Sequence, residues 1–356
     1  MESAQELQLK SILTNAVKSK ASDIHFSVGN SPILRVGDGL VSLDDQDVIT
    51  QDFMELLTGL ILSEEQKKKL ADNKELILTY NFDKDLRFKI NLFYQRGMLS
   101  ASLRHIPSQV PSLSSLGLGD EVIELANLKK GLVILAGPFG SGRSTTAAAL
   151  IEEINRNRKE YIITIENNSE YLFVNRQSII EQREIGRDTR SFADALNYFQ
   201  EENGDVLFLE EINDPEVIPM ILEIARGSSL VIACLGADSA SKVIARILDS
   251  FQSFDQERVR DLLSTALKAI LCQKLLPQNG GGMIVAYELL KNNDSVKSMI
   301  LSGSVGQLDN LIQTSKREGM ISFEQSLANL VKTGKISKED AEENVNDKNA
   351  LDNLLS

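Results

Sequence analysis

The residue pattern with the clearest chemical potential is a glycine-rich stretch near the middle of the chain. It reads Gly137-Pro-Phe-Gly-Ser-Gly-Arg-Ser144, follows the apolar run Leu132–Ala136 and precedes a segment of helical composition, Thr145–Ile151. Strand, glycine loop and helix in this order are the setting of a phosphate-binding loop. Gly140 and Gly142 let backbone amides close on a polyphosphate because no Cβ blocks the approach. The start of the helix adds unpaired N–H groups and a partial positive charge.

This loop predicts which groups would contact a bound nucleotide. The residues concerned are Gly137, Pro138, Gly140, Ser141, Gly142, Arg143, Ser144 and Thr145. We expect Ser144 to offer its hydroxyl to Mg²⁺, while Arg143 stands where such loops usually carry a lysine. The alternative is a Gly/Ser-rich turn between a buried strand and a helix, and the flanking segments favour the phosphate-binding interpretation.

Two other apolar runs end in carboxylates. The run Asp205–Glu211 has the form of a buried strand, and Glu211 is the candidate for polarising an attacking water. The run Ile163–Glu166 also ends in an acid, and Glu170 follows four residues later. Glu166 or Glu170 would contact Mg²⁺ through water or position the nucleophile. A structural role as solvated strand ends stays open for these acids.

Three basic residues, Arg87, Lys89 and Arg104, lie on predicted strands of the N-terminal part. Patterning favours side chains that face solvent. The alternative is that they reach a nucleotide in a neighbouring subunit, as arginine fingers do in trans. The two histidines, His25 and His105, are not spaced as a metal site and are interpreted as structural residues.

Composition limits the class of protein. The chain has 356 residues, of which 42% are hydrophobic and 25% charged, as in a globular protein. Its formal net charge of −13 argues against a nucleic-acid partner. No apolar run approaches the roughly 18 residues of a membrane span, and the start lacks the regions of a signal peptide. Cys234 and Cys272 lie in apolar segments and are expected in the core, in a reducing cytosol.

The N-terminal part of the chain predicts a mixed α+β domain over residues 1–106. It comprises a helix over 5–18, short strands at 22–27 and 32–36 with a turn at Gly37-Asp-Gly39, a helical stretch over 50–72 and strands between 76 and 106. Residues 107–119 are rich in Pro, Ser and Gly and are the predicted linker.

Strands and helices alternate beyond the linker. The predicted strands are 131–136, 161–166, 205–210, 230–235 and 283–289, and the predicted helices are 144–157, 190–202, 215–226, 239–249 and 256–275. Near-continuous apolar strands in such an alternation predict an α/β domain over 120–292, with a mostly parallel sheet covered on both faces. Residues 293–356 are expected to form short helices and a polar, acidic tail.

Several further motifs make the chain resemble a known family, the hexameric secretion ATPases of type II and type IV systems. Within that family the resemblance is to the PilT-like type IV pilus retraction ATPases, and it covers nearly the whole length. The matching segments are Ala21–His25, Phe88–Asn91, Leu103–Pro107, the glycine loop, Thr164–Glu166, Gln182–Glu184, Arg187–Thr189, Leu209–Asp214 and Ser239–Lys242. Two cysteines and a short N-terminal region resemble the retraction members rather than the extension members.

The resemblance implies a PAS-like N-terminal domain, a RecA-like P-loop ATPase domain and a ring of six subunits. It also implies ATP and Mg²⁺ held between the two domains, with Glu211 as the catalytic glutamate and basic residues of the first domain completing the site. The family converts ATP hydrolysis into pilus retraction and twitching motility. It works on the cytoplasmic face of the inner membrane, at the platform protein of the pilus base.

The chain departs from the family pattern at several places that contact nucleotide. Arg143 replaces the loop lysine, Lys89 an arginine, Glu210 a glycine and Gly236 a histidine, and Asn167-Asn168 replaces Asp-Pro. We expect weakened hydrolysis, because each lost transition-state contact lowers the rate. Two interpretations stay open: a divergent or auxiliary motor subunit, and an inactive structural or regulatory ring subunit that co-assembles with an active retraction ATPase. An unrelated P-loop switch conflicts with the N-terminal motifs.

Overall fold

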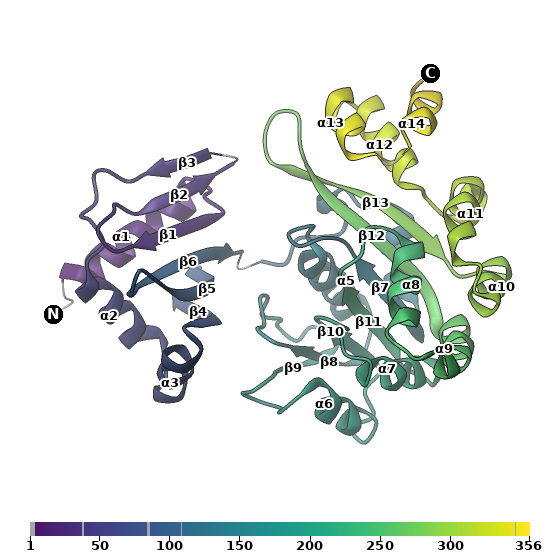
Figure 1. The fold of residues 1–356 in the computed structure, drawn as a ribbon, viewed down its shortest axis with the longest axis horizontal. Helices are drawn as coiled ribbons and strands as arrows, with labels where there is room; N and C mark the ends of the chain where they lie inside the picture. The colour runs from purple at the N-terminus through teal and green to yellow at the C-terminus, as the bar shows by residue number, and fades with distance from the viewer. Residues whose placement is uncertain (1–3, 38, 84–85, 108, 346) are drawn as a thin grey trace. The chain divides into compact units, whose positions relative to one another are not determined.

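The computed structural model describes residues 4–37, 39–83, 86–107, 109–345 and 347–356 (Figure 1). The chain divides into two compact units. The first comprises Met1–Gln109 and Asn168–Leu172, and the second Val110–Asn167 and Phe173–Ser356. The sequence pattern places residues 168–172 inside the predicted domain 120–292. In the structure this short segment groups with the first unit, because side chains of that unit bind it, as described below. The limits predicted for the domains stay predictions.

The first unit is an α+β fold built on an antiparallel sheet. Its six strands lie in the order β3-β2-β1-β6-β5-β4. The strands are β1 (Asp23–Ser27), β2 (Ile33–Val36), β3 (Gly39–Ser42), β4 (Glu75–Asp83), β5 (Leu86–Gln95) and β6 (Met98–Ile106). The helices are α1 (Ala4–Lys18), α2 (Gln51–Ile61) and α3 (Glu64–Asn73). They pack with the sheet around one apolar core, in which the rings of Phe26 and Phe53 meet edge to face at 5.3 Å.

Local capping explains where the helices of this unit begin. The Thr50 hydroxyl accepts a hydrogen bond from the Phe53 amide at the start of α2. Ser63 and Gln66 form a capping box at the start of α3. The stretch predicted as helical over 50–72 is therefore two helices. Asp38, the middle residue of the predicted hairpin turn, lies outside the described residues.

The second unit is built on a mostly parallel sheet of seven strands, in the order β13-β12-β7-β11-β10-β8-β9. The strands are β7 (Gly131–Ala136), β8 (Tyr161–Glu166), β9 (Ile179–Glu184), β10 (Val206–Leu209), β11 (Leu230–Leu235), β12 (Leu267–Pro277) and β13 (Met283–Lys291). All neighbouring strands run parallel except β13, which is antiparallel to β12. The predicted α/β class is thereby confirmed.

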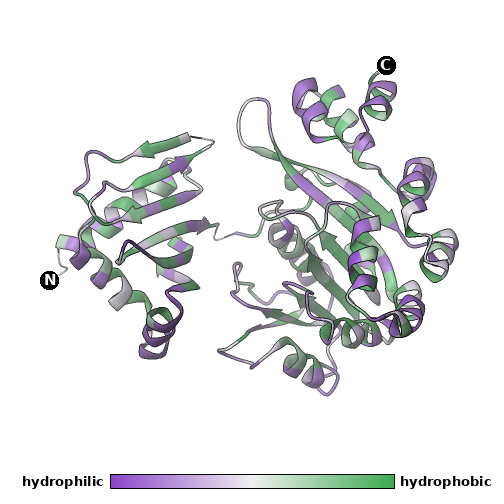
Figure 2. Cartoon of the chain, in the orientation of Figure 1, coloured by the Kyte–Doolittle hydropathy of each residue, from purple (hydrophilic) through white to green (hydrophobic). Residues whose placement is uncertain are grey.

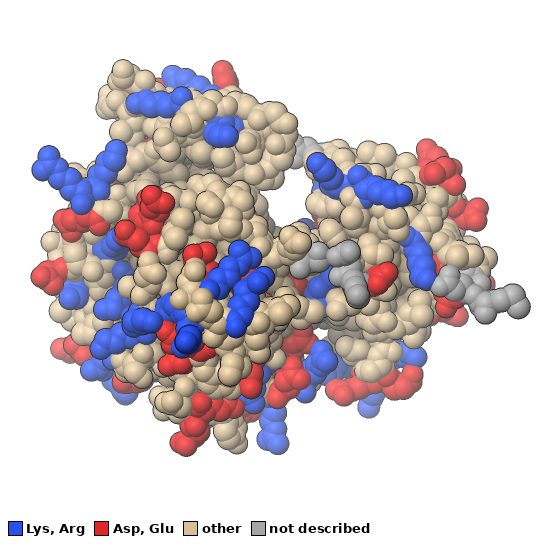
Figure 3. All heavy atoms as spheres, turned by 180° about the vertical axis from the view of Figure 1, so that it is seen from behind, with Lys and Arg blue, Asp and Glu red and all other residues tan. Residues whose placement is uncertain are grey.

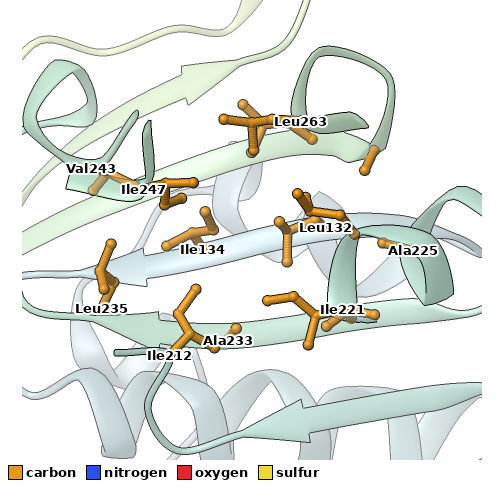
Figure 4. Packing of buried hydrophobic residues seen from close by; sticks show 14 of the residues in the cluster. Leu132, Ile134, Ile212, Ile221, Ala225, Ala233, Leu235, Val243, Ile247 and Leu263 are labelled. Atoms are coloured by element: carbon orange, nitrogen blue, oxygen red, sulfur yellow. The ribbon is translucent and has the colours of Figure 1, made fainter. Parts of the chain in front are cut away.

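Helices cover both faces of this sheet, and the strands between them are buried on both sides. The helices are α4 (Asp120–Ile123), α5 (Arg143–Asn157), α6 (Phe192–Phe199), α7 (Val217–Arg226), α8 (Ala240–Asp249) and α9 (Ser253–Ala266). Side chains of β7 alternate between two cores, with Leu132 and Ile134 in one and Val133 and Leu135 in the other. Figure 4 shows Leu132 and Ile134 among side chains of α7, α8 and α9, and β7 and β11 are correspondingly apolar in Figure 2.

The last part of the chain is helical, as predicted. Its helices are α10 (Asp294–Ser302), α11 (Leu308–Thr314), α12 (Phe323–Lys332), α13 (Lys338–Asn344) and α14 (Lys348–Leu355). The final ones pack on residues of β12 and β13 through a separate small core that includes Leu276, Phe323 and Leu351. The predicted polar tail is thus folded into α13 and α14 in the described residues.

The predicted pattern needs correction at two places, one predicted helix and one strand that was not predicted. The helix expected over 256–275 ends at Ala266, and the chain continues directly as strand β12. The sequence Leu267–Pro277 is mostly apolar but is interrupted by Lys268, Gln273 and Lys274, so it lacks the strict alternation that would distinguish a strand from a buried helix. Strand β9 was not predicted, because Ile179–Glu184 lies at the sheet edge, has no fully buried residue and carries polar residues.

The surface carries charges of both signs. Figure 3 shows Lys and Arg side chains interspersed with Asp and Glu on the face that it draws. In the part of the chain that the structure describes, none of the helices combines the length and the apolar character that a membrane span needs.

Candidate functional site

The glycine loop lies between the end of β7 and the start of α5, as the sequence predicts. Its backbone needs glycine at two positions. A Cβ on Gly137 would collide with the Gln273 carbonyl oxygen and the Ser141 hydroxyl, while Gly142 has a φ of +87° and leads directly into α5. No side chain caps the first turn of this 15-residue helix. Its first N–H groups are therefore available to an anion.

Several polar side-chain atoms around the loop are buried and have no hydrogen-bond partner among the described residues. They are Ser141 Oγ, Arg143 Nη1, Thr146 Oγ1 and Gln273 Oε1. Ser141, Thr146 and Gln273 are 3%, 1% and 1% exposed. Buried polar atoms are nearly always paired, so a group of them at one loop indicates a site for a polar ligand.

Gln273 on β12 anchors the glycine loop through a side-chain hydrogen bond. Its side-chain Nε2 donates a hydrogen bond of 2.7 Å to the Ser141 carbonyl oxygen. Both groups are buried, so this bond fixes the backbone of the loop against the central sheet. The sequence pattern did not indicate this residue, because the region was predicted as a helix.

Three carboxylates and Arg143 gather at the carboxyl end of the sheet. They are Glu166 at the end of β8 and Glu210 and Glu211 directly after β10. Burial raises the pKa of the Cys234 thiol on the neighbouring strand β11 to about 12; Arg143 opposes the rise and the three carboxylates add to it. All four charged groups therefore lie close enough to the Cys234 thiol to influence its pKa. Parallel strands end at the same edge, which is why residues far apart in sequence meet here.

The three carboxylates have different surroundings. Glu166 is 7% exposed and accepts a hydrogen bond of 2.7 Å from the Thr164 hydroxyl. Glu210 Oε2 accepts a bond of 2.6 Å from the Asn167 amide, which joins the ends of β10 and β8. Glu211 is half-buried. Glu166 and Glu211 thus lie at the edge of the sheet where the glycine loop follows β7, and their catalytic roles stay predictions.

Glu170 is not part of this group. It lies in the segment that groups with the first unit, where its Oε1 is 2.7 Å from Lys89 Nζ. Arg87 lies two residues from Lys89 on β5 and donates hydrogen bonds to the carbonyl oxygens of Ser169 and Glu170. Patterning favours solvent for these basic side chains. That expectation is wrong for Arg87 and Lys89, whose partners lie 81 to 83 positions away in the chain.

Arg104 and the histidines also have local roles in the first unit. Arg104 Nε donates to Asp23 Oδ1 at 2.9 Å, and its side chain is 52% exposed. The His105 ring packs on Phe88 with a centroid distance of 5.3 Å. His25 lies on β1, and its Nε2 is buried. Cys234 and Cys272 are both buried free thiols.

Arg246 on α8 is a further residue at the carboxyl end of the sheet that the sequence did not indicate. It donates one hydrogen bond to the Gly236 carbonyl oxygen and another, of 3.1 Å, to Asn213 Oδ1. It thereby joins the segments that follow β10 and β11. A lone arginine on an amphipathic helix carries no signal in the sequence, and only the fold brings it to this place.

The residues at the loop fit a nucleotide. The glycine backbone, the uncapped start of α5 and the buried polar atoms form a cradle for phosphate oxygens. Within the described ranges no group of three or more His, Cys, Asp or Glu residues is placed to hold a metal ion. A magnesium ion would therefore depend on phosphate oxygens for most of its ligands, in addition to any hydroxyl of the loop.

Comparisons with known proteins agree with this geometry. The chain is 32% identical over 337 residues to the type IV pilus retractation ATPase PilT of Pseudomonas aeruginosa, covering 95% of this chain and 98% of the relative. It is 32% identical to the type IV pilus ATPase PilU of the same organism, covering 94% of this chain and 88% of the relative. A crystal structure described as the pilus retraction motor PilT with bound ADP superposes with a TM-score of 0.87 at 37% identity, covering 99% of this chain and 100% of that one.

The model of the family described as "Type II/IV secretion system protein" matches residues 2–333, nearly the whole chain. The resemblance drawn from the motifs is thereby confirmed, and the chain belongs to the type II/IV secretion ATPase family.

Proposed function

We propose that this chain binds ATP with Mg²⁺ at the glycine loop and hydrolyses it slowly, as a subunit of a type IV pilus motor. The observation that carries the proposal is the group of buried, unpartnered polar atoms at the uncapped start of α5, within the described residues. The carboxylates at the adjacent strand ends support hydrolysis rather than binding alone. The relatives whose printed names are those of pilus retraction and pilus ATPases support the motor assignment.

Each residue of the site has a definite task in this proposal. The loop amides and Arg143 hold the phosphates, and the Ser144 hydroxyl is a ligand of Mg²⁺. Glu211, half-buried after β10, orients the attacking water and accepts its proton. Glu166, whose carboxylate is fixed by the Thr164 hydroxyl, would help to hold Mg²⁺ at the site. Bound Mg²⁺ supplies charge neutralisation at the phosphates.

The proposed setting is a homo-oligomeric ring, with six subunits as the expected number. The ring would act in the cytoplasm at the inner-membrane base of the pilus, against a platform protein. Arg87, Lys89 and Arg104 are the basic residues of the first unit that would act on a neighbour's nucleotide. Each is hydrogen bonded within its own unit, so acting in trans requires an exchange of partners.

The second candidate function is an inactive structural or regulatory subunit that co-assembles with an active motor. One observation favours it specifically. Glu170 Oε1 lies 2.7 Å from Lys89 Nζ, and this ion pair competes with a role of the carboxylate in holding magnesium or water. Under this alternative the site binds nucleotide to stabilise the ring, and the pilus is retracted by another subunit.

Binding and turnover on the purified full-length oligomer decide between the two. We expect Mg²⁺-ATP to bind and to be hydrolysed, and Glu211→Gln to lower turnover about 100-fold while leaving the Kd nearly unchanged. The control is Glu223→Gln, the same substitution at an exposed position on α7. Binding without any turnover that depends on Glu211 would favour the inactive subunit. Failure to bind ATP or ADP would remove both candidates.

A further inference from the structure

The position of Gly236 connects two arginines that are far apart in the sequence. Gly236 directly follows strand β11, and its φ lies outside the left-handed region, so the backbone there does not require glycine. A Cβ at this position would lie 3.3 Å from Arg246 Nη1 and 3.8 Å from Arg143 Nη1. Both guanidinium groups therefore lie next to this position. The distance to Arg246 is tight and the distance to Arg143 is an ordinary contact, so a side chain larger than a single carbon would meet both groups.

The two arginines differ in what they bind. The Arg246 guanidinium is engaged within the protein, because it donates hydrogen bonds to the Gly236 carbonyl oxygen and to Asn213 Oδ1. Arg143 Nη1 is buried, and within the described part of the chain it has no hydrogen-bond partner. Glu166 accepts a hydrogen bond from the Thr164 hydroxyl and Glu210 accepts one from the Asn167 amide. One buried guanidinium donor is thus left for a ligand.

The chemistry of this arrangement suits an anionic oxygen. Two guanidinium groups that converge on one point repel each other; the carboxylates at the strand ends offset part of this repulsion, and an anionic ligand would offset more of it. Guanidinium is planar and offers two parallel donors to a phosphate group. Arg143 is also the first residue of α5, so its backbone faces the phosphate cradle while its longer side chain extends to the end of β11.

We propose that Arg143 and Gly236 act as one unit that recognises the terminal phosphate of ATP. The missing side chain at residue 236 leaves room for the Arg143 guanidinium beside Arg246, where it binds the phosphate that ATP has and ADP lacks. Arg246 is a positioning residue, which holds the Gly236 segment in place. The inference rests on the proposed nucleotide site and adds a specificity determinant to it.

A double-mutant cycle on the full-length protein tests this coupling. The variants are Arg143→Lys, Gly236→Val and the double variant, all in the Glu211→Gln background, where turnover is suppressed. Dissociation constants are measured for Mg²⁺-ATP and Mg²⁺-ADP, and thermal unfolding checks that each variant is folded. The control is Gly39→Val, a glycine in strand β3 whose added Cβ would be no closer than 3.7 Å to a neighbouring atom.

The expected result is specific to ATP. Either single substitution lowers the preference for ATP over ADP about tenfold, and the second adds less than about twofold, because both remove the same contact. Gly236→Ala, with one carbon instead of three, gives a smaller loss than Gly236→Val.

Two outcomes would overturn the inference while leaving the nucleotide site intact. One is losses of ATP affinity that add independently in the double variant. The other is equal weakening of ATP and ADP binding, which is the result of a purely structural role. If the unmodified chain binds neither nucleotide, the proposed function fails and this inference fails with it.

Discussion

Lys89 Nζ lies 2.7 Å from Glu170 Oε1, and both side chains are mostly buried, at 28% and 23% exposure. Lys89 comes from strand β5 and Glu170 from the short segment 168–172, which is 81 positions later in the chain. The pair therefore fixes a loop that, in sequence, belongs to the strand–helix alternation of the second unit. Glu170, for which the motif pattern predicted a catalytic role, thus has a structural contact with Lys89.

The first prediction concerns this ion pair. Lys89→Met or Glu170→Gln should each lower the free energy of unfolding by about 0.5–1 kcal/mol, and the double variant should lose little more than one of them. Glu170→Gln should leave ATP turnover within about twofold, because its carboxylate is already neutralised. Denaturant unfolding and steady-state hydrolysis are the two measurements.

The exposed pair Lys67–Glu64 provides the control, since its side chains are 42% and 89% exposed and should contribute almost nothing. A large loss of turnover in Glu170→Gln, with stability unchanged, would return Glu170 to the catalytic group.

The second prediction concerns Glu210, whose Oε2 accepts the Asn167 amide at 2.6 Å. Glu210→Gln keeps an oxygen acceptor for that bond but removes one negative charge near the phosphate cradle. We expect the Kd for Mg²⁺-ADP to fall roughly fivefold, because like charges at short range repel the phosphates. Isothermal titration calorimetry at low salt measures the change.

Glu223→Gln removes the same charge from an exposed part of α7 and should have no effect on binding. If the two variants tighten binding equally, the effect comes from net charge and the specific role of Glu210 is refuted.

The predictable parts of the fold are those set by local pattern. Strands β7 and β11 are continuous apolar runs between turn residues, and the glycine loop follows one of them directly. Because parallel strands end at the same edge of a sheet, the meeting of Glu166 and Glu211 at that edge follows from the residue pattern alone. The loop and two of its three acids were therefore predictable.

What escaped prediction depends on contacts between distant residues. Strand β12 was missed because its apolar run is equally compatible with a buried helix, and Gln273 was missed with it. The partner of Lys89 and the proximity of Arg143 to Gly236 follow from the tertiary fold alone. The departures from the family pattern are visible in the sequence, but only the fold shows that two of them, Arg143 and Gly236, lie next to each other.

The third prediction concerns Gln273, which is 1% exposed and donates 2.7 Å to the Ser141 carbonyl oxygen. Gln273→Leu keeps the volume but leaves that buried oxygen without its donor, so we expect the unfolding free energy to fall by about 1–3 kcal/mol. The loop also loses its anchor, and nucleotide affinity should fall about tenfold. Chemical denaturation and calorimetric titration provide the readouts.

Gln278→Leu serves as a control, because Gln278 follows the end of β12 and is half-buried, whereas Gln273 is fully buried within the strand. Unchanged affinity in Gln273→Leu, together with lowered stability, would limit Gln273 to a purely structural role.

The last prediction is a pH dependence of stability centred on Glu288 of β13. Burial, with smaller contributions from Asp309 and Glu324, raises the pKa of this carboxyl to about 7, although the Ala240 amide donates to it at 2.8 Å. The folded state therefore keeps a proton that the unfolded chain releases at its ordinary pKa near 4.5. The stabilisation is complete below pH 4.5 and is lost as the pH rises to 7, a change of up to about 3 kcal/mol.

Glu288→Gln should thus gain stability relative to the unmodified chain between about pH 5 and pH 8 in denaturant titrations. The exposed-helix variant Glu343→Gln should give a constant difference over the same range, and a constant difference for Glu288→Gln as well would show that its carboxyl is ionised in the folded state throughout.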